Sequence, residues 1–455
     1  MEPANRLIPP IFFVIPQYCG TPQKIKTLLS IFPTFSQRTP KSGRLLGRDF
    51  LSHHMRVYLH DYAGHPFQVQ LARALAERGH TVRHGYSSTN QTPQGALARR
   101  DGDPDGFEPD PIALANPIEK YAHSLRGLWA RRKREKEYGA LLIERIVHFH
   151  PDVVLAANTP LDALAPLQRW CSEQDVRFVN WLQDLISVAS HRLLRRKLPV
   201  LGEFAGRIYV GMEQRILRAG DAIVMITDDF RPILTRWGVK PERLHVVENW
   251  APLEEMPVRP KKNPWSEAFG LAEKQVLLYS GTLGMKHNPT LLLNLALRWK
   301  DDDSVRVVVI AEGAGADWLR EKKTEQSLEG LVVLPYQPFE EFPDVLASAD
   351  VLLAILEPEA GVFSVPSKVL TYLCAGRAVL LAVPPENLAA QIITRTGSGV
   401  VVPPTAPTAF VYEAAKLLGD GERRAEAGQN ARAYAETTFD IERITDRFEA
   451  ILTGP

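Results

Sequence analysis

Two stretches of the chain combine glycine, serine or lysine residues in patterns that suit a phosphate group. The first is VLLYSGTLGMKHNPTLLLNLALRW, residues Val276–Trp299, in which Gly281 and Lys286 follow a short apolar run. We interpret that run as a buried parallel strand and the residues from Pro289 as a helix, with Asn288 and Pro289 as its cap and first turn. Free N–H groups at a helix N-terminus attract anions. The stretch therefore predicts either an anion site or only a tight turn between strand and helix.

The second stretch is GVFSVPSKVLTYLCAGRAVL, residues Gly361–Leu380. Ser367 is placed to cap a helix that ends at Gly376, and Lys368 falls in its first turn. A cation is unfavourable there, because that end of the helix dipole is positive. We therefore interpret Ser367 and Lys368 as phosphate ligands, with charge-assisted hydrogen bonds worth roughly 1.5–3 kcal/mol each. The alternative is that Lys368 is a solvated surface residue.

Composition narrows the class of protein to which the chain belongs. Its 455 residues exceed one ordinary core and predict roughly two to three domains. A net charge of +1 gives no general attraction to nucleic acid, and no nucleic-acid recognition motif accompanies the local basic runs. Cys19, Cys171 and Cys374 are widely scattered, which indicates neither a metal site nor a disulfide framework and suits a reducing cytosol. No run reaches the ~18 apolar residues needed to span a bilayer.

Short apolar runs alternate with helical runs along most of the chain, which predicts an α/β fold with parallel sheets wrapped on both faces. The alternation starts at Met55 and restarts after a proline-rich linker, so we expect two doubly wound, Rossmann-like domains facing a cleft. The predicted parts are residues 1–54, an extension that is either disordered or a product of start-site choice; 55–250, the first wound domain; 251–264, the linker; 265–435, the second wound domain; and 436–455, a helix able to cross back to the first domain.

At this point the chain resembles a retaining glycosyltransferase of family 4 with the GT-B fold, of the bacterial colanic-acid and O-antigen type. The pieces that carry the resemblance are HDYAGHPFQVQLARALAERGHTV, FVNWLQDL, IVMITDDFRPILTRWGV, VVENWAPLEE, LYSGTLGMKHNP, IAEGAG and VPSKVLTYLCAGRAVL. The resemblance implies that a sugar moves from a nucleotide diphosphate-sugar to a glycan or lipid-linked acceptor, with retention and without an essential metal or cofactor. It implies a cytoplasmic enzyme of cell-envelope polysaccharide or lipopolysaccharide synthesis.

The resemblance also implies that residues 265–435 are the nucleotide-sugar domain, with the donor site, and that residues 55–250 are the acceptor-side domain. The leaving diphosphate develops negative charge that must be stabilised in place of a metal, so Lys286 and Lys368 are catalytic candidates. The other implied donor contacts are Gly281 and Thr282 at the diphosphate, Glu312 and Gly313 near the nucleotide, Tyr336 and Gln337 near the base, Ser367 at a phosphate oxygen, and Gly64, which lets the first domain's backbone approach the donor.

The chain departs from the family at two carboxylates of the usual signature. Their places hold Phe363 and Thr371, and Glu357 or Glu359 can substitute for the first. Contacts to ribose and sugar hydroxyls are therefore left open, with Thr371 retained as a donor-binding candidate.

The first domain departs from the family as well. Where many members carry a histidine, this chain has Gln183 followed by Asp184. Asp184 either acts in catalysis, by orienting the acceptor or stabilising positive charge at the sugar carbon, or caps the next turn. His60, Asp61 and His65 form a polar cluster in the first glycine loop; we favour Asp61 or His65 meeting the acceptor over a metal site, because the spacing fits no closed site.

Two basic runs contain apolar residues, SLRGLWARRKREK from Ser124 and HRLLRRKLPVL from His191. Each is either a solvated helix face or a contact with an anionic membrane surface, which would place the protein peripherally on the inner face of the plasma membrane. Two other functions stay open: a two-domain sugar-nucleotide epimerase, and a non-catalytic scaffold that binds a sugar nucleotide.

Overall fold

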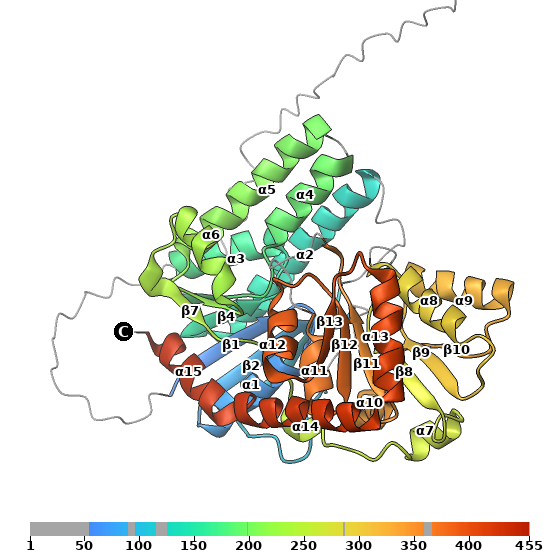
Figure 1. Ribbon diagram of the computed structural model, residues 1–455. Helices are drawn as coiled ribbons and strands as arrows, with labels where there is room; N and C mark the ends of the chain where they lie inside the picture. The colour runs from blue at the N-terminus through green and yellow to red at the C-terminus, as the bar shows by residue number, and fades with distance from the viewer. Residues whose placement is uncertain are drawn as a thin grey trace, which may run out of the picture. The chain divides into compact units, whose positions relative to one another are not determined.

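The structure, a computed structural model, describes residues 54–89, 96–114, 125–197, 199–284, 287–358 and 366–454 (Figure 1). The predicted N-terminal extension lies outside these ranges except for its last residue. Lys286, Glu359 and Phe363 also lie outside them.

The first domain is built on a seven-stranded parallel sheet with the strand order β3-β2-β1-β4-β5-β6-β7. The chain runs outward from β1 to β3 and then returns to β4 beside β1, so the strand order reverses between β1 and β4. The strands are β1 Arg56–Asp61, β2 Thr81–Ser87, β3 Phe107–Ile112, β4 Val153–Ala157, β5 Arg177–Leu182, β6 Ala222–Met225 and β7 Leu244–Val246. The helices are α1 Pro66–Glu77, α2 Leu125–Phe149, α3 Leu161–Glu173, α4 Ile186–Lys197, α5 Pro199–Ala219 and α6 Arg231–Arg236, with 3₁₀ turns η2 Asp228–Phe230 and η3 Pro241–Arg243.

The second domain repeats this plan with six parallel strands in the order β10-β9-β8-β11-β12-β13. Its reversal lies between β8 and β11. The strands are β8 Gln275–Ser280, β9 Val305–Ile310, β10 Leu331–Leu334, β11 Val351–Ile355, β12 Ala378–Ala382 and β13 Gly399–Val402. The helices are α7 Pro264–Ala268, α8 Thr290–Arg298, α9 Ala314–Gln326, α10 Phe342–Ala347, α11 Lys368–Cys374, α12 Leu388–Thr396, α13 Pro407–Gly419 and α14 Gly421–Thr438, with η4 Leu253–Glu255 in the linker and η6 Phe339–Glu341.

The central strands are apolar along their whole length because helices cover both faces of each sheet. Every residue of β4, β11 and β12 is buried. This pattern of continuous apolar runs is what predicted a parallel sheet, and the prediction of two doubly wound α/β domains is confirmed.

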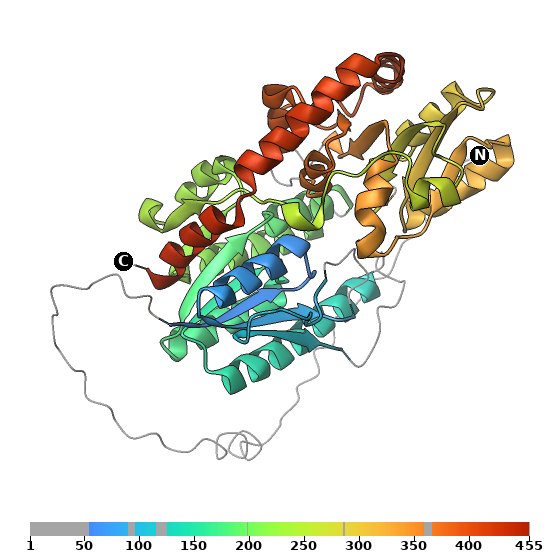
Figure 2. The same cartoon turned by 90° about the horizontal axis from the view of Figure 1, so that it is seen from below.

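The last helix, α15 Ile441–Thr453, packs against α1 of the first domain (Figure 2). The Phe448 ring lies 4.6 Å from the Trp181 ring, centroid to centroid. At the edge of this contact the Arg78 guanidinium donates to the carboxylates of Glu442 and Glu449 at 2.9 Å each. The C-terminal end of the chain is therefore part of the first domain's core.

Local structure differs from the sequence-based prediction at the two expected helix caps. Helix α8 begins at Thr290, and Asn288 adopts a left-handed backbone conformation with φ 49° instead of capping the helix. Asparagine tolerates this conformation because its short polar side chain hydrogen-bonds locally. The hydroxyl of Ser367 makes no capping bond either, because its backbone is already helical at φ −54° and ψ −29°.

Within the described residues, no helix combines the length and the apolar character that crossing a bilayer requires. The strand β3, whose sequence FEPDPI holds two prolines, and the hairpin of α4 and α5 were not anticipated. A strand at the edge of a sheet tolerates proline because one side of its backbone needs no partner.

Candidate functional site

A cavity of about 580 Å³ lies at the carboxyl ends of β8 and β11, where the strand order of the second sheet reverses. Such a reversal leaves a crevice beyond the strand ends, which is where ligands bind in open α/β sheets. Residues of the first domain complete the wall. The sequence-predicted residues that line it are His65, Asp184, Gly281, Thr282, Tyr336, Gln337, Ser367, Lys368 and Thr371.

Lys368 is the cation in the wall of this cavity. Its Nζ lies 3.8 Å from the centroid of the Tyr279 ring, and the side chain is half-buried. Among the described residues no carboxylate lies within ion-pair distance of that amine, so beyond the Tyr279 ring no charged partner compensates for lost hydration. Desolvation lowers the pKa of Lys368 to about 7.

Gly281 makes room for the lysine. Its backbone has φ 126°, a conformation that side chains disfavour, and a Cβ there would lie 2.8 Å from the Lys368 Nζ. The structure therefore assigns Gly281 a steric role beside the amine as well as a turn.

Three tyrosines hold the end of β8 and the loop that follows it. The Tyr372 hydroxyl accepts from the Ser280 N–H at 3.0 Å and donates to its carbonyl at 3.2 Å. The Tyr279 hydroxyl donates to the Thr282 carbonyl at 2.8 Å, and the Thr282 hydroxyl shares a hydrogen bond of 3.1 Å with the Tyr336 hydroxyl. These hydrogen bonds hold the loop in place without a ligand.

On the first-domain side, Asp61 is fully buried at the end of β1, and its carboxylate accepts hydrogen bonds from its own loop. It accepts from the backbone N–H groups of Ala63, at 3.1 Å, and His65, and from the Asn158 amide at 3.2 Å. Of the two acceptor candidates in this loop, Asp61 is not among the residues that line the cavity and His65 is, and contact with an acceptor stays a prediction. Gly64 also lies behind the wall, with φ 76°, and does not line the cavity.

His65 is the residue of this loop that does reach the cavity. Its Nδ1 lies 3.3 Å from each Asp61 carboxylate oxygen. Burial by itself lowers the pKa of His65, but Asp61, and more weakly Asp184, outweigh burial and raise the pKa above its ordinary value. The imidazole is therefore held toward its cationic form at the edge of the cavity.

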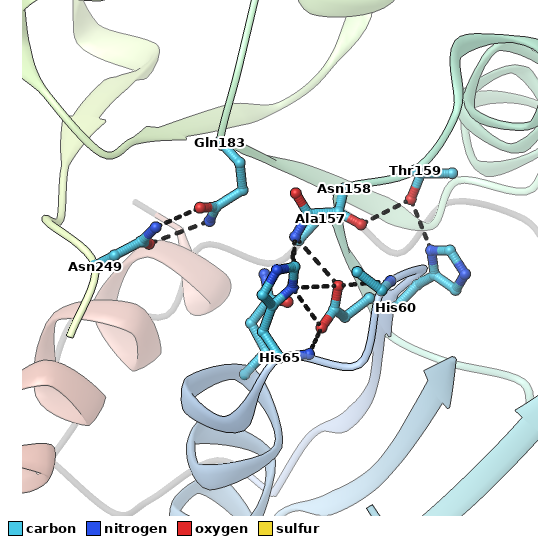
Figure 3. Close-up of polar contacts among 10 residues, drawn as sticks. His60, His65, Ala157, Asn158, Thr159, Gln183 and Asn249 are labelled. Carbon is cyan, nitrogen blue, oxygen red and sulfur yellow. Dashed lines mark hydrogen bonds and ion pairs between the residues drawn. The ribbon is translucent and has the colours of Figure 1, made fainter. Parts of the chain in front are cut away.

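Asp184 lines the cavity two residues before α4. The buried Glu213 carboxylate of α5 accepts from the Ser187 N–H at 3.3 Å and from the Ser187 hydroxyl, at the start of α4. Burial raises the pKa of Glu213 to about 7. The catalytic role and the capping role of Asp184 both stay predictions. The neighbouring Gln183 exchanges two amide hydrogen bonds with Asn249 (Figure 3).

The metal alternative for the first glycine loop finds no support in the geometry. His60 is fully buried, with Nδ1 2.7 Å from the Thr159 hydroxyl and Nε2 2.9 Å from the Tyr138 hydroxyl. Burial lowers the pKa of His60 to about 3, so the ring is neutral. Across the described part of the chain, no group of three or more His, Cys, Asp and Glu side chains is arranged to hold a metal ion.

Two family models match the chain side by side. Residues 65–250 match the glycosyl transferase 4-like domain, and residues 261–434 match the glycosyl transferases group 1. The chain belongs to the family 4 glycosyltransferases.

Curated relatives agree with this family. The colanic acid biosynthesis glycosyl transferase WcaI of Escherichia coli (strain K12) is 27% identical over 180 residues, 38% of this chain and 42% of WcaI, so the match spans less than half of that relative. The D-inositol 3-phosphate glycosyltransferase of Kineococcus radiotolerans is 26% identical over 310 residues, 61% of this chain and 68% of the relative.

Solved structures show the same GT-B fold. HepE of Anabaena in complex with UDP is 15% identical with a TM-score of 0.61, over 86% of this chain and 98% of HepE. WaaG, a glycosyltransferase of lipopolysaccharide biosynthesis, is 18% identical with a TM-score of 0.60, over 88% of this chain and all of WaaG. The expected GT-B fold is confirmed.

Glu312, Gly313 and Gln337 stay donor-site predictions for this family 4 chain, and the structure shows what surrounds them. Glu312 and Gly313 do not line the cavity. Their backbone supports it instead: the Leu283 N–H donates to the Glu312 carbonyl at 3.2 Å, and Gly313 has φ 107°. Gln337 does line the cavity, but its amide oxygen accepts from the Trp265 indole at 3.0 Å and its amide nitrogen donates to the Pro335 carbonyl at 2.9 Å.

Of the two candidates to replace the first missing signature carboxylate, only Glu357 lies within the described residues. Glu357 does not line the cavity; its carboxylate lies 3.9 Å from Nε2 of His287, which does. His287 and Tyr279 are cavity residues that sequence reasoning missed. Tyr279 is the second-last residue of β8, directly before the predicted loop, so its position could have suggested it, whereas nothing local marked His287 beyond its place in that loop.

Proposed function

We propose that this protein is a retaining glycosyltransferase that moves a sugar from a nucleotide diphosphate-sugar to a glycan or lipid-linked acceptor, without an essential metal. The observation that carries the proposal is the Lys368 amine, which faces the cavity with no acidic partner within ion-pair distance among the described residues. An unpaired, desolvated amine gains most from an anionic ligand, because the ligand restores the stabilisation of its charged form.

The diphosphate would bind between Lys368 and the loop of Gly281 and Thr282. As the bond from the anomeric carbon to the diphosphate breaks, negative charge grows on the leaving oxygen. A preorganised amine in a dry site stabilises that charge without reorganising. Lys286, which lies outside the described residues, remains a sequence-based candidate for the same task.

Asp184 would act on the other side of the reacting carbon. The anomeric carbon gains positive charge while the leaving group departs, and a carboxylate on the cavity wall stabilises it. We therefore expect Asp184→Asn to lower kcat on the order of 10²-fold while UDP binding is retained, in keeping with the loss of one electrostatic group. Near-normal turnover by Asp184→Asn would remove Asp184 from the catalytic group.

The colanic-acid relationship supports an acceptor from envelope polysaccharide synthesis, and the uridine nucleotides bound by HepE support a uridine donor. The decisive test is a calorimetric and thermal-shift panel of UDP, GDP, UDP-glucose and GDP-mannose, each with and without EDTA. We expect one nucleotide family to bind and EDTA to leave its binding unchanged.

Hydrolysis of the bound donor, followed by NMR of the released sugar, then tests catalysis and retention. Binding without hydrolysis or transfer to any acceptor would indicate a scaffold, and inversion at the anomeric carbon would contradict the mechanism. Absence of binding by every nucleotide would overturn the proposed function.

A further inference from the structure

Helix α5 carries a buried carboxylate that the proposed mechanism does not use. Glu213 is exposed by only 3%, and the other buried residues of α5 are glycine, isoleucine and leucine. Among the described residues, no lysine, arginine or histidine lies within ion-pair distance of Glu213. A buried carboxylate without a cation costs free energy unless hydrogen bonds stabilise it. The hydrogen bonds of Glu213 therefore show what this carboxylate holds in place.

Those hydrogen bonds come from the first turn of the neighbouring helix. Helix α4 begins at Ile186, and the Glu213 carboxylate accepts from the N–H of Ser187, at 3.3 Å, and from its hydroxyl. An N–H group in the first turn has no partner within its own helix, and the positive end of the helix dipole favours a carboxylate there. Ser187 is fully buried as well. Glu213 thus fastens the start of α4 from a position 26 residues further along the chain.

Helices α4 and α5 pack closely enough to keep this contact fixed (Figure 1). A Cβ on Gly202 would lie 2.1 Å from the Leu194 carbonyl oxygen, and a Cβ on Gly206 would lie 2.1 Å from the His191 ring. Both glycines of α5 therefore allow an approach to α4 that a side chain would prevent. The carboxylate is presented to α4 by a tightly packed pair of helices and not by a loop.

The short turn before α4 is held at its other end too. Strand β5 ends one residue before Gln183, and α4 begins two residues after Asp184. The amides of Gln183 and Asn249 exchange two hydrogen bonds (Figure 3). Asp184 therefore lies in a turn that is anchored both before and after it.

Two cavities meet at this turn. Asp184 lines the cavity of about 580 Å³. A second cavity, of about 30 Å³, lies within the first domain, and Asp184 and Glu213 both line it. Within the described part of the chain, Asp184 is the one residue that lines both. The small cavity is of the size that holds water and is too small for a sugar. Glu213 is therefore separated from the larger cavity by the turn that carries Asp184.

We propose that Glu213 is a positioning residue: through Ser187 it fixes the start of α4 and so holds the Asp184 carboxylate in place on the cavity wall. The inference rests on the proposed function, in which Asp184 stabilises positive charge at the anomeric carbon. Such a group contributes only when it is held in the right geometry, and a displacement of about 1 Å can cost on the order of 10²-fold in rate. A role confined to stability would leave the turnover of the folded variant unchanged.

The test compares kcat and KM for hydrolysis of UDP-glucose, or of GDP-mannose if that is the donor that the unaltered chain accepts. We expect Glu213→Ala to lower kcat by about 10–100-fold with KM changed by less than about twofold, since no donor contact is lost. Glu213→Gln, whose amide oxygen still accepts from Ser187, should recover most of that loss. Ser187→Ala keeps the N–H bond and loses the hydroxyl bond, so kcat should fall by about fivefold.

Asp110→Ala is the matched control for the loss of a buried carboxylate from the same domain. Asp110 is exposed by 5%, accepts from the Tyr58 hydroxyl at 2.8 Å and lines neither cavity. This variant should lower the melting temperature and leave the kcat of the folded protein unchanged.

A double variant separates positioning from stability more sharply. If Glu213 acts through Asp184, adding Glu213→Ala to Asp184→Asn should change kcat by less than about twofold, because the group that Glu213 positions is already disabled. Effects of the two substitutions that multiply would overturn the proposal, as would a kcat of Glu213→Ala equal to that of Asp110→Ala. Should Glu213→Ala fail to fold, an undiminished kcat in Ser187→Ala would overturn it equally. Failure of the proposed function looks different: the unaltered chain would then hydrolyse neither donor, and the inference would fall with it.

Discussion

The two domains each place a glycine-bearing loop directly after the first strand of a doubly wound sheet, but the two loops are electrostatic opposites. After β1, the carboxylate of Asp61 fills the loop and accepts its N–H groups from within. After β8, the neighbouring charge is the amine of Lys368, and no carboxylate among the described residues pairs with it. The loop after β1 thus contains its own negative charge. The loop after β8 lies beside a positive charge that can bind an anionic ligand.

This contrast shows that topology alone does not make an anion site. A strand that turns into a helix offers N–H groups in both domains. The first loop is saturated by its own chain, so it serves to position His65, whose ring faces the cavity. The second loop can bind an anion because Gly281 leaves room for the Lys368 side chain. Tyrosine hydroxyls hold the backbone of the loop by hydrogen bonds. We therefore expect changes in the second loop to affect donor binding and changes in the first to affect stability and His65.

The largest effect is expected from Lys368→Ala. Removing a desolvated amine that would make charge-assisted bonds to a diphosphate should weaken UDP binding by about 10–100-fold, at roughly 1.5–3 kcal/mol per bond. Folding should be preserved, since the unpaired buried charge is itself unfavourable. Isothermal titration measures the affinity. The control is Lys416→Ala, because Lys416 also lies over a tyrosine, Tyr412, at 5.2 Å but on the surface. Equal effects of Lys368→Ala and Lys416→Ala on UDP affinity would show that the second loop binds an anion no better than the first.

The pH dependence of donor binding sharpens the same contrast. With the pKa of Lys368 lowered to about 7, the free amine loses its charge as the pH rises through 7, and a bound diphosphate must restore the proton. The affinity for UDP-glucose should therefore fall by up to tenfold per unit between pH 7 and 8.5, since one pKa unit is about 1.4 kcal/mol. The phosphates of this diester do not titrate in that range. Lys368→Ala should abolish the slope, and a slope that survives in the variant would point to another group.

The third test is Gly281→Ala. The substitution forces a side chain into a left-handed backbone and against the Lys368 amine, so we expect unfolding free energy to drop by about 1–3 kcal/mol and UDP binding to weaken. Thermal denaturation with and without UDP measures both. Gly211→Ala on α5, where a Cβ would meet nothing within 4 Å, is the control. Unchanged UDP binding by Gly281→Ala would contradict the close approach of Lys368.

The smallest effect on the donor is expected from Asp61→Asn. The amide cannot accept from all the N–H groups that the carboxylate does, so stability at pH 7 should fall by about 1–3 kcal/mol. Because Asp61 raises the pKa of His65, that pKa should decrease in the variant, as followed by NMR of the imidazole. UDP affinity should change less than in Lys368→Ala.

The pH dependence of the first loop's contribution to stability follows from the pKa shifts of Asp61 and His65. Burial raises the pKa of Asp61, but His65 and the backbone bonds outweigh it and lower the pKa, so this stabilisation is present above the unfolded pKa and is lost as the pH falls through the folded one. The raised pKa of His65 gives stabilisation that is present below its unfolded value and is lost as the pH rises through the folded one. The control is Asp105→Asn, a change at a fully exposed carboxylate. If the pKa of His65 is unchanged in Asp61→Asn, the Asp61 carboxylate does not set the charge of the first loop. That result would contradict the electrostatic difference between the two loops.

Much of the fold was predictable because it depends on local patterns. Continuous apolar strands such as β8 and β11 alternate with helices, and this order indicates a doubly wound sheet without any knowledge of distant contacts. The β3 strand was missed because its two prolines conceal it. The α4–α5 hairpin was missed because the basic run from His191 was read for its charge.

The candidate site was predictable in its chemistry and less so in its geometry. Glycine, serine and lysine types after a strand pointed to Ser367, Lys368 and Gly281, and all three line the cavity. Nothing local distinguished Asp61, whose carboxylate accepts from its own loop, from Asp184, which lines the cavity. Glu213, 29 positions after Asp184, accepts from the Ser187 N–H at the start of α4, and such long-range pairings are set by helix packing.

By itself, the sequence determined the repeated strand–loop–helix plan and the residue types in both loops, because backbone periodicity and residue chemistry are local properties. Only the tertiary structure decided which loop keeps a free charge. Desolvation and ion pairing depend on neighbours that are distant along the chain: Lys368 lies 87 positions after Gly281, and Asn158 lies 97 positions after Asp61. The electrostatic difference between the two loops thus arises from packing, which brings a lysine to one and leaves a carboxylate enclosed in the other.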